Sequence, residues 1–157
     1  MTQPLPLPMG FILTALWARS SEKALSPLPD AYTRGIAMAE KILVVDDSKL
    51  VTDIVRMRLE MFGYDVRLAH SGEEALEKIA QEVPDLMVLD VQMPGIDGYE
   101  VCRRLRDDPA LDDLRIIMLT SSDDKHAAYE AGVDDYLNKD VDLLNLPNRV
   151  KLVLEMQ

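Results

Sequence analysis

Two adjacent carboxylates, Asp46 and Asp47, stand directly after the apolar run at residues 42–45. A buried strand that ends in two like charges is costly, because neighbouring carboxylates repel and each raises the pKa of the other. A divalent cation between them would remove that repulsion. Oxygen ligands together with water suit Mg²⁺, a hard cation that keeps part of its hydration shell. The pair therefore predicts a magnesium site at the end of this strand.

Three further residues whose side chains could take part in a reaction stand at or near the ends of later apolar runs. They are Asp90, Thr120 and Lys139. Neighbouring parallel strands lie about 4.8 Å apart, so groups at their ends can converge. A carboxylate can act as a nucleophile and form an aspartyl-phosphate. A metal ion and an ammonium would offset charge on the transferring group, and a hydroxyl would donate to one of its oxygens. Each residue alone is an ordinary cap, strand end or surface residue, but together they predict phosphoryl transfer to Asp90.

The segments that must position these groups alternate between runs of strand length and stretches with helical spacing. The apolar runs are residues 42–45, 66–69, 86–89, 116–119 and 136–137. Near-continuous apolar strands joined by helices imply a parallel sheet covered on both faces. In such sheets function gathers at the carboxyl ends of the strands. We therefore expect an α/β fold of (βα)5 order.

Local signals place the helices between these runs. Ser71 and Glu74 have the spacing of a capping box that opens the second helix. Gly63 can end the first helix in a left-handed conformation, and Gly132 closes the fourth. The inner face of the first helix is predicted to carry Leu50, Ile54, Met57, Leu59 and Met61. The core is also expected to be filled by the methionines Met57, Met61, Met87 and Met118.

Charge and composition divide the chain of 157 residues in two. Residues 1–39 are rich in proline and carry a net charge of +1. The whole chain has a net charge of −11, so the remaining residues carry −12. We expect residues 1–39 to be a flexible N-terminal extension, with Met38 as a candidate native start, and residues 40–157 to form one domain. The acidic balance argues against direct nucleic acid binding, because phosphate contacts need Lys and Arg.

Compartment signals point to the cytoplasm. Cys102 is the single cysteine, so no intrachain disulfide can form, which fits a reducing compartment. The apolar run at residues 9–18 lacks the positive region that opens a signal peptide. No stretch reaches the roughly 18 apolar residues that a membrane span needs. We expect a cytoplasmic protein without a membrane partner.

The combined pattern resembles the receiver domains of two-component response regulators. The resemblance runs from about residue 41 to residue 155. It rests on Asp46-Asp47, D-x-x-M-P-G-x-D-G at residues 90–98, Thr120, A-G-x-D-D-Y-L at residues 131–137, and Lys139. It implies a flavodoxin-like, doubly wound (βα)5 fold with a five-stranded parallel sheet in the order 2-1-3-4-5.

The resemblance also implies a chemical role for each site residue. Asp90 would be the phosphoacceptor for a histidine kinase or a histidine phosphotransfer protein, with Thr120 and Lys139 assisting the transfer. Mg²⁺ would be bound by Asp46, Asp47, Asp90 and the backbone carbonyl of Gln92.

Signal output would follow from a switch pair in the same pattern. Thr120 and Tyr136 would change the surface of the fourth helix, fifth strand and fifth helix, toward an unknown downstream protein. Gln92 and Ser122 would flank the attacking water and tune dephosphorylation.

Two features depart from that family. The interval from Thr120 to Lys139 is about three residues short, close to one turn of the fourth helix. Asp140 stands where the family usually has proline, so we expect looser placement of Lys139 and competition from the Asp140 carboxylate for its ammonium. A proline in the fifth helical segment moves its predicted start to Leu146, with Asn145 as the cap.

Three classes of function stay open. The main hypothesis is a phosphorylated signalling domain that is not an enzyme for outside substrates and has no attached output domain, because the chain ends with the fifth helix. A pseudo-receiver, which switches without phosphate, is favoured only by the short fourth helix and Asp140. An aspartate-nucleophile phosphatase usually needs a second aspartate two residues after the nucleophile, where this chain has Gln92.

Overall fold

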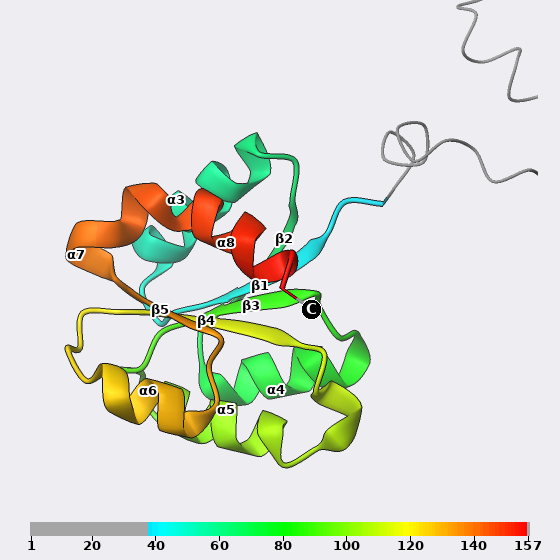
Figure 1. The fold of residues 1–157 in the computed structure, drawn as a ribbon, viewed down its shortest axis with the longest axis vertical. Helices are drawn as coiled ribbons and strands as arrows, with labels where there is room; N and C mark the ends of the chain where they lie inside the picture. The colour runs from blue at the N-terminus through cyan, green and yellow to red at the C-terminus, as the bar shows by residue number, and fades with distance from the viewer. Residues whose placement is uncertain (1–37, 157) are drawn as a thin grey trace, which may run out of the picture. The chain divides into compact units, whose positions relative to one another are not determined.

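The sheet that carries the site is parallel and has five strands. The computed structural model describes residues 38–156, so the predicted extension at residues 1–39 lies almost wholly outside the described residues. The strands join in the order β2-β1-β3-β4-β5 (Figure 1). Their bounds are β1 (Lys41–Val45), β2 (Asp65–Ala69), β3 (Leu86–Leu89), β4 (Arg115–Thr120) and β5 (Asp135–Asn138). The predicted doubly wound fold and its strand order are confirmed.

Helices cover both faces of this sheet (Figure 1). On one face lie α3 (Lys49–Met61), α7 (Lys139–Asp142), the short 3₁₀ turn η2 (Leu143–Asn145) and α8 (Leu146–Leu154). On the other face lie α4 (Gly72–Gln81), α5 (Gly98–Arg106) and α6 (Lys125–Ala131). A second 3₁₀ turn, η1 (Pro109–Leu111), leads from α5 to β4. None of the helices within residues 38–156 has both the length and the apolar character that a bilayer crossing needs.

Strand β1 illustrates why the apolar runs are continuous. Leu43 and Val45 belong to the core beneath α4, α5 and α6, whereas Ile42 and Val44 belong to the core beneath α3 and α8. Successive side chains of a strand point to opposite faces, so a strand buried on both faces must be apolar throughout. All four side chains are at most 3% exposed. The first polar residue, Asp46, therefore comes where the strand reaches the edge of the sheet.

Most helix boundaries follow the predicted caps. The Ser71 hydroxyl accepts a hydrogen bond from the Glu74 backbone N–H at 3.0 Å, which is the first half of the predicted capping box. The Glu74 carboxylate accepts the His70 N–H at 2.8 Å, one residue before the position that a capping box uses. Gly63 and Gly132 have φ values of +90° and +101°, so each ends its helix in the left-handed region that glycine adopts without strain.

The start of α8 at Leu146 is as predicted, but the role given to Asn145 is wrong. Asn145 has helical φ and ψ angles of −91° and −3°, and its side chain makes no cap hydrogen bond. The reason is that η2 runs directly into α8, so no extended residue precedes the helix.

The predicted inner face of α3 is right at Leu59 and wrong at the other four positions. Thr52, Val55 and Leu59 are buried, whereas Leu50, Met57 and Met61 are 70%, 61% and 79% exposed. Helix α3 has apolar residues on two faces, and periodicity alone does not say which one meets the sheet. Of the four methionines assigned to the core, Met87 and Met118 are fully buried, and the two on α3 are not.

Candidate functional site

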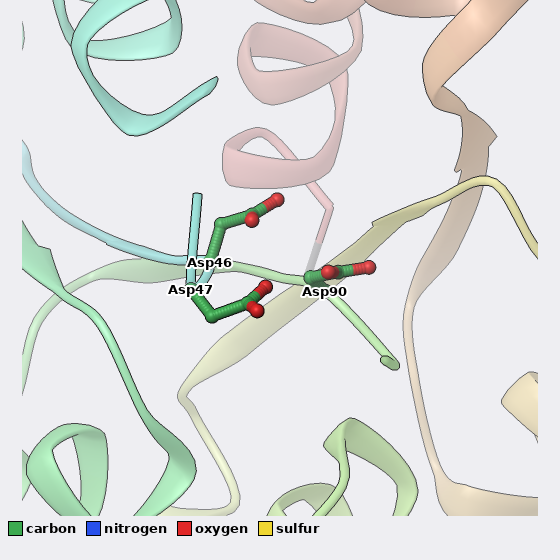
Figure 2. Close-up of side chains that lie close together, drawn as sticks. All are labelled: Asp46, Asp47 and Asp90. Carbon is green, nitrogen blue, oxygen red and sulfur yellow. The ribbon is translucent and has the colours of Figure 1, made fainter. Parts of the chain in front are cut away.

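The ends of β1 and β3 bring three predicted carboxylates together. Val45 pairs with Leu89 across the two strands, so the residues that follow them, Asp46 and Asp90, lie side by side. One carboxylate oxygen from each of Asp46, Asp47 and Asp90 lies within 4.8 Å of the others, and Figure 2 shows the three side chains close together. The parallel register thus confirms that these strand ends converge.

Lys139, at the end of β5, completes this group. Its Nζ atom forms an ion pair with Asp46 and another with Asp90, at 3.1 Å from Asp90 Oδ2. The Lys139 side chain is only 17% exposed. The expectation that Asp140 would divert this ammonium is therefore wrong: Asp140 is exposed in the first turn of α7. We call Asp46, Asp47, Asp90 and Lys139 the carboxyl-edge cluster.

The electrostatics of this cluster are unbalanced, since three carboxylates share one ammonium. Burial raises the pKa of Asp90, and the charge of Asp46 raises it further; Lys139 and the Thr120 hydroxyl oppose this only in part. Burial acts to lower the pKa of Lys139, but its hydrogen bond to Asp46 and the charge of Asp90 outweigh that effect and raise it. Lys139 therefore stays protonated, and negative charge remains in excess.

The donor set fits a divalent cation. Its atoms are hard carboxylate oxygens, two of the three side chains are buried, and Asp47 is exposed to solvent. With all three carboxylates ionised, the one ammonium leaves a surplus of two negative charges, which a divalent cation would balance. Mg²⁺ prefers such oxygen ligands and retains water on its open side. Asp46, Asp47 and Asp90 could thus hold it.

Backbone contacts fix the orientation of Asp90. Its Oδ1 atom accepts a hydrogen bond from the Val91 N–H at 2.8 Å, and the Gly98 N–H donates to the Val91 carbonyl at 2.9 Å. A Cβ atom on Gly98 would lie 2.2 Å from the Asp90 carbonyl oxygen. Only glycine allows this approach of α5 to β3. Sequence analysis quoted Gly98 within a pattern but gave it no role, because the contact depends on the tertiary path of the loop.

The predicted switch residues flank the cluster on β4 and β5. Thr120 is fully buried, and its Oγ1 accepts a hydrogen bond from the Ser122 N–H at 3.2 Å. The Tyr136 ring packs in the core beneath α4, α5 and α6, and Lys125 Nζ lies 5.7 Å from the ring centroid. The Tyr136 hydroxyl is buried without a hydrogen-bond partner among residues 38–156. Leaving a buried hydroxyl unpaired is unfavourable.

The opposite end of the sheet carries a second group of charges. Asp134 forms ion pairs with Arg106 at 3.1 Å and with Arg115 at 3.4 Å, and it accepts the Ile116 N–H at 2.8 Å. Two guanidinium groups and a backbone donor thus serve a single carboxylate. We call Asp134, Arg106 and Arg115 the amino-edge cluster. Sequence analysis missed this arrangement, since Arg106 and Arg115 carry no local signal that pairs them with Asp134.

Known proteins similar to this chain share its fold. The family model of the response regulator receiver domain matches residues 42–151. The chain belongs to this family. It is therefore a receiver domain of two-component signalling, as its resemblance predicted.

Individual proteins similar to this chain are also response regulators. Response regulator MprA of Mycobacterium tuberculosis is 48% identical over 120 residues, which are 74% of this chain and 51% of MprA. The chain thus spans about half the length of the curated relatives it matches. A candidate response regulator from Chloroflexus aurantiacus is 43% identical with a TM-score of 0.72, over 76% of this chain and all of that one. TrrA of Thermotoga maritima, solved with Mg²⁺ and BeF, is 34% identical with a TM-score of 0.65, over 73% of this chain and 98% of that one.

Proposed function

We propose that this receiver domain takes a phosphoryl group onto Asp90 from a histidine kinase or a histidine phosphotransfer protein. The observation that carries the proposal is the surplus negative charge around a buried carboxylate that is already paired with Lys139. A cluster so unbalanced is unfavourable for folding alone, and it suits a site that binds a divalent cation. The cation and Lys139 together would then offset the charge of an incoming phosphoryl group.

The chemistry follows from the groups present. An ionised Asp90 oxygen attacks the phosphorus of the donor phosphohistidine, a P–O bond forms, and the P–N bond breaks, which leaves the electron pair on the donor imidazole. The Lys139 ammonium, already beside Asp90, offsets charge on the phosphoryl oxygens. The Thr120 hydroxyl donates to one of these oxygens. Mg²⁺, held by Asp46, Asp47, Asp90 and the Gln92 carbonyl, would supply further charge neutralisation.

Residues next to the carboxyl-edge cluster would transmit the signal after phosphorylation and set the rate of dephosphorylation. Movement of Thr120 toward the phosphoryl group vacates space for the Tyr136 ring and so alters the α6, β5 and α8 surface. The unpaired Tyr136 hydroxyl supports a low cost for this change. Gln92, which is exposed, and Ser122, which is half-buried, flank the attacking water and tune dephosphorylation.

An exposed apolar stripe on α3 supports a phosphodonor protein that binds through a helix. It consists of Leu50, Ile54, Met57 and Met61 on α3. Spacings of four, three and four residues suit packing against a second helix. Val141 and Leu144 extend the exposed apolar surface, and Arg58 of α3 donates to the Leu144 carbonyl at 3.2 Å. Since α3 and α7 begin beside the carboxyl-edge cluster, a helical partner on this stripe could present its phosphohistidine to Asp90.

The proposal also covers the bounds of the domain and the place where it acts. Residues 40–157 form the receiver domain, and residues 1–39 are an extension to it. The protein acts in the cytoplasm by protein–protein contact and not by contact of this domain with nucleic acid. The pairing of Lys139 with Asp46 and Asp90 removes one of the two reasons to favour a pseudo-receiver.

Phosphorylation of the full chain by acetyl phosphate with Mg²⁺ tests this function. Intact mass should rise by one phosphoryl group in the wild type and in Asp134→Asn, which leaves the cluster untouched. Asp90→Asn should gain none. A wild type that stays unlabelled, or a labelled Asp90→Asn variant, would refute the assignment.

A further inference from the structure

The turn from β5 into α7 has no connecting loop, and Asn138 shapes it. Asn138 ends β5 with extended φ and ψ angles of −87° and 127°, and Lys139 is the first residue of α7. The Asn138 Oδ1 atom accepts the Asp140 N–H at 2.8 Å, and Asp142 Oδ2 accepts the Asn138 N–H at 3.0 Å. These two hydrogen bonds join residues before and after Lys139, so they constrain the turn that contains it.

This cap explains how Lys139 keeps its place without the proline that usually follows it in the family. A proline at position 140 would fix φ but would carry no N–H. Asp140 has an N–H, and Asn138 uses it. The flexible stem of a lysine reaches a defined point only if its Cα atom is held. The observed pairing of Lys139 Nζ with Asp46 and Asp90 shows that it reaches the cluster.

A third hydrogen bond links this turn to the neighbouring strand end. The Asn138 Nδ2 group donates to Asp123 Oδ1 at 3.3 Å. Asp123 lies in the loop that follows Thr120, and Thr120 itself accepts the Ser122 N–H in that loop. One amide side chain thus bridges the backbone beside Lys139 and the loop beside Thr120.

We propose that Asn138 is a positioning residue that holds Lys139 and the Thr120 loop in one arrangement for phosphoryl transfer. The inference rests on the proposed function, because Lys139 and Thr120 matter only if a phosphoryl group reaches Asp90. Asn138 makes no contact with the reacting atoms. It acts mainly through Lys139, and its longer hydrogen bond to Asp123 adds a smaller effect through the Thr120 loop.

The test compares rates of phosphorylation of the full chain by acetyl phosphate with Mg²⁺, followed by intact mass. Asn138→Ala removes the cap and should slow labelling roughly tenfold, as loss of a supporting partner commonly does. Asn138→Ser keeps a cap acceptor and should retain at least about half of the wild-type rate. Asn145→Ala is the matched control: Asn145 also precedes a helix but makes no cap hydrogen bond, so its rate should not change.

A double-mutant cycle separates positioning from general damage. If Asn138 acts through Lys139, then Asn138→Ala should change the rate less than about twofold in a Lys139→Ala background. The same tenfold loss in that background, or equal rates for Asn138→Ala and the wild type, would overturn the inference. An unlabelled wild type would instead reject the proposed function itself, so the two failures can be told apart.

Discussion

The two ends of the sheet treat charge in opposite ways. At the amino edge, Asp134 is satisfied by Arg106, Arg115 and a backbone N–H. At the carboxyl edge, three carboxylates share the single ammonium of Lys139.

This difference separates a structural cluster from a functional one. A carboxylate with two cationic partners stabilises the fold, and removal of its charge leaves those cations unpaired. A buried carboxylate crowded by others weakens the fold, as the raised pKa of Asp90 indicates. Charge that folding leaves uncompensated therefore points to a missing positively charged ligand, and the three carboxylates suit a divalent cation.

The largest effect is expected where the backbone supports the carboxyl edge. Gly98→Ala should lower the free energy of unfolding by about 3 kcal/mol or more, because its Cβ would meet the Asp90 carbonyl oxygen at 2.2 Å. Gly63→Ala is the control: it also has positive φ but nothing within 4 Å, so about 1 kcal/mol is expected. Urea denaturation measures both, and similar losses would mean that the close approach is not rigid.

Loss of charge at the amino edge should come next. Asp134→Asn should lower the free energy of unfolding by about 2 kcal/mol, since Arg106 and Arg115 lose their carboxylate while only partly exposed and keep only backbone carbonyls as partners. Phosphorylation by acetyl phosphate should continue. A variant as stable as the wild type would mean that the amino-edge cluster does not stabilise the fold.

Removal of a negative charge at the carboxyl edge should raise the free energy of unfolding, whereas it lowers it at the amino edge. In metal-free buffer, Asp90→Asn should raise the free energy of unfolding by about 1 kcal/mol, because it removes a buried charge beside Asp46. Urea denaturation in EDTA gives this value. A loss of stability as large as that of Asp134→Asn would show that Asp90 is a structural anion after all.

The smallest effect concerns pH. A carboxyl group whose pKa is raised in the folded state binds more protons there than when unfolded, so stability falls as pH rises through that pKa. The stability advantage of Asp90→Asn in EDTA should therefore be least at low pH, where Asp90 is protonated in both states, and should grow as pH rises through the raised pKa of Asp90. An advantage that is greatest at low pH would reverse the inferred direction of the shift.

Sequence patterns predicted the sheet and the cluster for the same physical reason. A strand buried on both faces must be apolar, so each run ends where the edge begins, and the first polar residue is placed there. Asp46, Asp90 and Thr120 were found in this way.

What the sequence did not predict depends on tertiary contacts. The orientation of α3 required knowledge of which apolar face meets the sheet, and Met57 and Met61 were assigned to the wrong one. The pairing of Arg106 with Asp134 joins segments whose approach has no local signature. The cap at Asn138 is local, but it was missed because no helix was predicted to begin at Lys139. Asp140 was expected to disturb Lys139, whereas its N–H helps to hold the turn.

Thermal unfolding with and without Mg²⁺ tests the central claim most directly. An ion that binds only the folded state stabilises it, so millimolar Mg²⁺ should raise the wild-type midpoint by several degrees. Asp47→Asn, which changes an exposed ligand and no core contact, should lose this rise, and Asp134→Asn should keep it. A wild-type midpoint that does not move, or a full rise in Asp47→Asn, would contradict the claim that the carboxyl-edge cluster is built to receive a divalent cation.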